Sequence, residues 1–84
     1  MSAHAYIQWA DVPQELISSS GQIIDSATQA KLVAFDGCPF CGEITENSKK
    51  ALQVEYAFPR SHELRNSLID WFIHHGISFV VLAS

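Results

Sequence analysis

The sequence predicts a small α+β domain: a mostly antiparallel sheet with one short and one longer helix. Two observations point to this fold class. Residues 52–58 alternate apolar and polar side chains with the period of two that is typical of a half-buried strand. Residues 61–75 carry apolar side chains at the i, i+4, i+7 and i+8 spacing of an amphipathic helix. No linker, repeat or low-complexity tract is visible, so we expect one domain, 1–84.

The N-terminal part predicts a strand followed by a short helix. The strand is expected over residues 5–9. Asp11 is a good N-cap for the helix, and Pro13 falls in the first turn, where its missing N–H costs little. We expect this helix to run to about Ser19, with Gly21 as its C-terminal stop.

The middle of the chain predicts two pairs of strands. Residues 22–25 and 30–35 read as one pair separated by a short turn. Residues 43–58 read as a hairpin that Pro59 ends, and this interpretation is favoured over a helix leaving the cysteines because residues 45–50 are polar and turn-like.

The C-terminal part predicts the longer helix and a last strand. Ser61 is the expected N-cap and Gly76 the expected stop. Residues 77–83 form a continuous apolar run, which predicts a strand buried in the sheet or against a partner chain. Four helix residues are expected on the face that packs on the core: Leu64, Leu68, Trp71 and Phe72.

Composition narrows the class of protein. The formal net charge is −4, and the five basic side chains are scattered, so direct nucleic-acid binding is not expected. The apolar runs are too short to span a membrane, and no signal peptide is visible at the N-terminus. We therefore expect a cytoplasmic protein, whose two cysteines serve metal or redox chemistry rather than a structural disulfide.

The segment Cys-Pro-Phe-Cys-Gly, residues 38–42, is the most distinctive motif. A tight turn of this kind aims both sulfurs at one point and backbone N–H groups at the thiolates, and Gly42 is expected to take the left-handed conformation. The segment resembles the knuckle of zinc-ribbon and treble-clef domains. The resemblance implies one zinc ion with Cys38 and Cys41 as ligands, although the chain has no second Cys-x-x-Cys pair.

Histidines are the candidates for the remaining ligands. His62 lies in the first turn of the predicted helix, while His74 and His75 lie in its last turn. Twelve helical residues span roughly 18 Å at about 1.5 Å per residue, so His62 and His74 cannot both reach one zinc ion. Either end of the helix could supply the ligand, His4 is a more remote candidate, and a site shared between two chains is a further possibility. Each histidine could equally be an ordinary surface or helix-end residue.

Two other resemblances give alternatives. Cys-Pro-Phe-Cys after a strand also resembles the start of glutaredoxins, which implies a thiol–disulfide oxidoreductase with Cys38 as the attacking thiolate and Cys41 as the resolving cysteine. Residues 55–61, with Asn66 beyond, resemble the strand-to-helix segment of His-Asn-His nucleases. Tyr56 stands there in place of the catalytic histidine, which implies an inactive relative.

The function class expected from these observations is a non-enzymatic interaction module. A small acidic chain with a full core and no catalytic constellation is typical of inhibitors and adaptors, including the counter-defence proteins of phages and mobile elements. We expect a protein partner, and the continuous apolar strand at the C-terminus makes a homodimer plausible, because an uncovered apolar edge strand is a liability in a monomer. The thiol oxidoreductase is the alternative.

Overall fold

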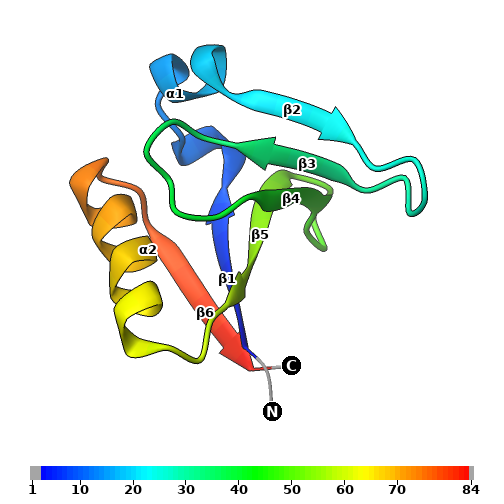
Figure 1. Cartoon of the computed structure of the whole chain (residues 1–84). Coiled ribbons are helices and arrows are strands. Elements are labelled where there is room, and N and C mark those ends of the chain that lie inside the picture. Colours follow the sequence, from blue (N-terminus) through cyan, green and yellow to red (C-terminus); the bar gives the residue numbers. More distant parts are fainter. Residues whose placement is uncertain (1–2, 84) are drawn as a thin grey trace.

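The computed structural model describes residues 3–83 and confirms the α+β fold class: two α-helices accompany one six-stranded antiparallel sheet (Figure 1). The predicted hairpin over 43–58 is confirmed, as are the strand pair before the cysteines and the long helix. In chain order the elements are β1 (Ala3–Gln8), the 3-10 helix η1 (Trp9–Asp11), α1 (Gln14–Ser19), β2 (Gly21–Ile24), β3 (Lys31–Ala34), β4 (Gly42–Glu46), β5 (Leu52–Phe58), α2 (His62–His74) and β6 (Phe79–Ala83).

The strand order of the sheet is β2-β3-β4-β5-β1-β6. Four consecutive strands form a meander, and β1 then pairs with both β5 and β6, with Ala3 opposite Ala83 in the second ladder. The first strand is therefore interior, while β2 and β6 are the two free edges of the sheet. Figure 1 shows these edges at opposite ends of the sheet, in cyan and red.

One face of the sheet packs against α2 and forms the core. Strand alternation turns Ala5 and Ile7 of β1 to this face, opposite Tyr56 and Val54 of β5. The helix covers them with buried residues of its own, and Phe72 is fully buried beside Tyr56, at 5.6 Å between ring centroids. The buried helix residues are Leu68, Trp71 and Phe72, three of the four predicted.

The ends of α2 follow the prediction, but its first turn does not. Ser61 is the N-cap and accepts a hydrogen bond from the backbone N–H of Leu64, and Gly76 takes a φ of 67° beyond the last turn. The Leu64 side chain, expected in the core, is exposed. Arg65 lies closer to the sheet instead, with its guanidinium 4.9 Å from the centre of the Phe58 ring.

The predicted start of the first helix is wrong. Asp11 belongs to η1, and α1 begins only at Gln14, with Pro13 at the N-cap position and no side-chain cap. The reason is the proline, because a residue that precedes proline is disfavoured in the helical conformation. Val12 is accordingly extended, with a ψ of 127°, and separates the two helices.

Two further expectations need correction. Gly21 does not stop the first helix in a left-handed conformation; it is the first residue of β2, after an extended Ser20. The C-terminal strand is not buried in the sheet. Among the strands of residues 3–83 it pairs with β1 alone, and Val80, Val81 and Leu82 are exposed.

Candidate functional site

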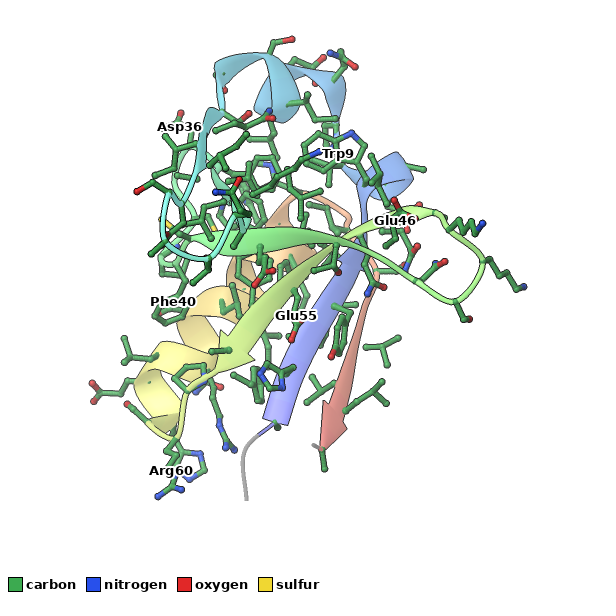
Figure 2. The ribbon with its side chains drawn as sticks, turned by 90° about the vertical axis from the view of Figure 1, so that its right-hand side faces the viewer. Trp9, Asp36, Phe40, Glu46, Glu55 and Arg60 are labelled. Carbon is green, nitrogen blue, oxygen red and sulfur yellow. The ribbon has the colours of Figure 1, made fainter. Side chains whose placement is uncertain are left out.

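The cysteine turn connects β3 to β4 beside the C-terminal half of α2. The backbone N–H of Cys38 donates to the carbonyl oxygen of Phe35, and Gly37 takes a φ of 77°. The indole N–H of Trp71 donates to the carbonyl oxygen of Asp36 at 3.3 Å, which ties the entry of the turn to the helix. Figure 2 shows Asp36, before the turn, and Phe40, within it, both at the left of the view.

Gly42 has a different role from the one predicted. It is the first residue of β4, is buried, and does not have a positive φ. A Cβ atom at this position would lie 2.3 Å from Cγ1 of Val54 and 2.9 Å from Cε1 of Tyr56. Glycine is required because the buried side chains of β5 occupy the space that a side chain would need.

Cys38 is half-buried against the core. Its Sγ lies 3.8 Å from the hydroxyl oxygen of Tyr56, within hydrogen-bonding distance for sulfur. Burial raises the pKa of the Cys38 thiol, and its interactions with the Phe40 backbone N–H and the Tyr56 hydroxyl only partly oppose this. Burial also raises the pKa of Tyr56. Both groups are therefore neutral at physiological pH, and Cys38 is not an activated thiolate.

Cys41 occupies a more open position. It is exposed, and neither cysteine is in a disulfide. Its neighbours include Ile23, Leu32 and Ala34, with which it lines a shallow cavity of about 170 Å³ next to β2. The charge of a Cys41 thiolate would further raise the pKa of Cys38, so the two thiols are close enough to interact.

The predicted histidine ligands do not gather around the cysteines. His62 and His74 are the first and last residues of α2 and are exposed. His75, which follows the last residue of α2, is half-buried, with its ring 4.9 Å from that of Trp71. Because the Trp71 indole is hydrogen-bonded to the cysteine turn, His75 packs on the side of the helix end that faces this turn. His4 lies on the other face of the sheet from Tyr56, with its Nε2 3.6 Å from Oε2 of Glu55.

These positions do not complete a zinc site within residues 3–83. A structural zinc takes four ligands, and no group of three or more His, Cys, Asp or Glu residues in this part of the chain is arranged to hold a metal ion. The thiols of Cys38 and Cys41 supply two ligands at most. Zinc binding stays a prediction, and it would require ligands that these residues do not bring together.

The structure also bears on the two alternative resemblances. In glutaredoxin-like chemistry the attacking cysteine sits at a helix N-terminus, whereas the strand β4 follows Cys41 here, and burial raises the pKa of Cys38. In the nuclease-like segment, β4, β5 and α2 do form a hairpin and helix. Tyr56, however, is fully buried among core residues and cannot meet a substrate.

Exposed apolar side chains gather mainly at the two free edges of the sheet, and of these the sequence pattern singled out only the C-terminal strand. At the β2 edge, Ile23 and Ile24 are 67% and 62% exposed. They border an open groove of about 510 Å³, which we call the β2 groove; its lining residues are Gln22, Ile23, Ile24, Lys31, Leu32 and Ile44. At the other edge, three consecutive residues of β6 are exposed, Val80, Val81 and Leu82.

On the face of the sheet away from α2, the central strands β1, β4 and β5 carry polar side chains, among them His4, Glu43 and Glu55. Glu55 points from this face in Figure 2, beside His4 and opposite Glu43 of β4.

None of the helices in the described part of the chain has the length and hydropathy needed to cross a membrane. Comparison of the chain with known protein families, with curated proteins and with solved structures finds no significant match.

Proposed function

We propose that this chain is a small acidic interaction module, of the inhibitor or adaptor kind, that binds another protein at the β2 groove. The observation that carries the proposal is the pair of exposed isoleucines on an unpaired edge strand, beside an open groove of about 510 Å³. An exposed apolar edge is a liability in a free monomer, and natural proteins usually protect such edges with charges or proline. The β2 strand, Gly-Gln-Ile-Ile, has neither.

The chemistry of the groove defines the partner segment. The free edge of β2 offers backbone N–H and C=O groups to an added strand, and Ile23, Ile24 and Ile44 offer apolar contacts beside it. Lys31 is the one charged residue that lines the groove. A matching segment is therefore extended and apolar, with a carboxylate near the end that lies beside Ile24, where it can meet Lys31.

The cysteine turn has a supporting role in this proposal. Cys38 packs against Tyr56 behind β4, and Cys41 borders the cavity beside Ile23. The turn thus holds the base of the β2–β3–β4 meander against the core. A zinc ion at Cys38 and Cys41, as the knuckle resemblance implies, would add to this support without taking part in partner binding.

The experiment is a selection from a displayed library of random peptides against the purified protein, followed by affinity measurement of the enriched peptides by fluorescence anisotropy. We expect enrichment of extended apolar peptides that contain Asp or Glu. The variant Ile23→Lys/Ile24→Lys should bind them at least about 30-fold more weakly, because two central apolar contacts are lost. Its stability should be nearly unchanged, since both side chains are already largely exposed.

The matched control is Val80→Lys, which places a charge on the opposite edge of the same sheet and should bind the peptides like the wild type. The proposal is overturned if no peptide is enriched. It is equally overturned if the peptides bind the two variants with the same affinity.

A further inference from the structure

We infer that the β6 edge pairs with the β6 edge of a second copy of this chain, in antiparallel orientation, to form a twofold-symmetric dimer with a continuous twelve-stranded sheet. This inference is independent of the proposed function, because β6 and β2 are the opposite edges of the sheet (Figure 1).

The composition of the edge is the first argument. The strand β6, Phe-Val-Val-Leu-Ala, contains no charge, proline or glycine, so nothing protects its free backbone groups from pairing. Both sides of the edge are apolar as well. Val80 and Leu82 are exposed on the face away from α2, and Val81, which points to the helix side, is 39% exposed. A partner strand must therefore bring apolar side chains on both of its faces.

Self-complementarity identifies a second copy as that partner. An antiparallel pair centred on Val81 places Val80 opposite the partner's Leu82 on the open face. On the helix side it places the large Phe79 opposite the partner's Ala83, so that size is matched across the interface. The β2 edge lacks this property, because the same pairing would place Gln22 opposite an isoleucine.

Charge and area agree with this occupant. The acidic side chains that give the chain its net charge of −4 are absent from β6, so repulsion between two copies does not act at the centre of the interface. The three exposed apolar residues of β6 and the free strand edge would bury roughly 800 Å² in a symmetric pair, the size of a weak, transient interface. We therefore expect dissociation constants of about 10 to 100 µM.

Sedimentation velocity of the full chain over about 1 to 500 µM tests the inference. The wild type should shift from monomer to dimer across this range. Val80→Lys should raise the dissociation constant at least about 30-fold, because it places two lysines against apolar partners in each dimer. Ile23→Lys/Ile24→Lys should dimerise like the wild type, which separates this inference from the proposed function.

The register is tested by a matched pair of double variants. Val80→Lys/Leu82→Glu places each new lysine opposite a glutamate of the other copy and should recover dimerisation by at least about tenfold over Val80→Lys. Val80→Lys/Leu82→Lys should remain monomeric. Thermal melts confirm folding, which these exposed positions should not perturb. If the two double variants have the same dissociation constant, the proposed register is wrong. If the wild type stays monomeric over the whole concentration range, the inference is wrong, and the β6 edge is then a binding edge for a strand of another protein.

Discussion

Replacement of Gly42 by alanine should destabilise this protein strongly, although the change adds a single methyl group. The new Cβ would lie 2.3 Å from Cγ1 of Val54 and 2.9 and 3.0 Å from two ring atoms of Tyr56. Carbon atoms pack at about 3.5 to 4.0 Å. Because Val54 and Tyr56 are both fully buried, neither side chain can move aside freely.

The size of the effect follows from two opposing contributions. Overpacking of this kind costs about 3 kcal/mol, the upper end of the usual range. A glycine-to-alanine change recovers about 0.4 to 1 kcal/mol by restricting the unfolded chain. The net loss of about 2 to 2.5 kcal/mol corresponds to a fall in Tm of about 10 to 15 °C for a domain of this size.

The assay is thermal and urea unfolding followed by circular dichroism, with Gly21→Ala as the matched control. No atom lies within 4 Å of a Cβ at Gly21, which also begins a strand, so this variant should be as stable as the wild type or slightly more stable. Adding Val54→Ala to Gly42→Ala removes the closest contact, and the double variant should lose about 1 kcal/mol less than the sum of the single losses. A Gly42→Ala variant as stable as Gly21→Ala would refute the packing argument.

Two further predictions concern the cysteine turn. The unfolding free energy should fall as the pH rises above about 9, by up to about 1.4 kcal/mol per pH unit for each group, because Cys38 and Tyr56 lose protons there in the unfolded chain while burial keeps them protonated in the folded protein. Urea titrations between pH 7 and 10 measure this dependence, which should be shallower in Cys38→Ala. An identical slope in that variant would contradict the assignment to Cys38. If zinc binds at the turn, native mass spectrometry of protein purified without chelator should detect one bound ion. Mild acid or the double variant Cys38→Ala/Cys41→Ala should remove the ion and lower the melting temperature. A metal-free wild type that is as stable as the double variant would contradict the prediction.

The parts of the fold that local sequence specifies were predictable. The hairpin of β4 and β5 follows from strict alternation, and α2 follows from its apolar spacing between Ser61 and Gly76. The predicted start of α1 is wrong because Pro13 disfavours the helical conformation at Val12, and this outweighs the capping preference of Asp11.

The parts that depend on contacts distant in sequence were not predictable. Gly42 was expected to serve a turn, since a sequence cannot distinguish a glycine needed for its φ from one needed for space. The side chains that exclude a Cβ at Gly42, Val54 and Tyr56, belong to β5, the strand that pairs with β4. The edge position of β6 depends likewise on its pairing with β1 at the other end of the chain.

The candidate site shows the same division. The cysteine motif was visible at once, but its environment was not, because burial by Tyr56 and the placement of the histidines are properties of the assembled sheet and helix. The sequence predicts that Ile23 and Ile24 lie in one strand of a pair, but it does not predict that this strand is an edge. The strand order, which makes β2 an edge, is what gives them significance.

The most direct test of this account is an NMR titration of the ¹⁵N-labelled protein with the tightest-binding peptide from the selection. We expect the backbone amide signals that shift most to belong to residues 21–24, 31–32 and 44, which form β2 and the walls of its groove. Shifts concentrated instead at residues 38–41 would contradict the account and would assign binding to the cysteine turn.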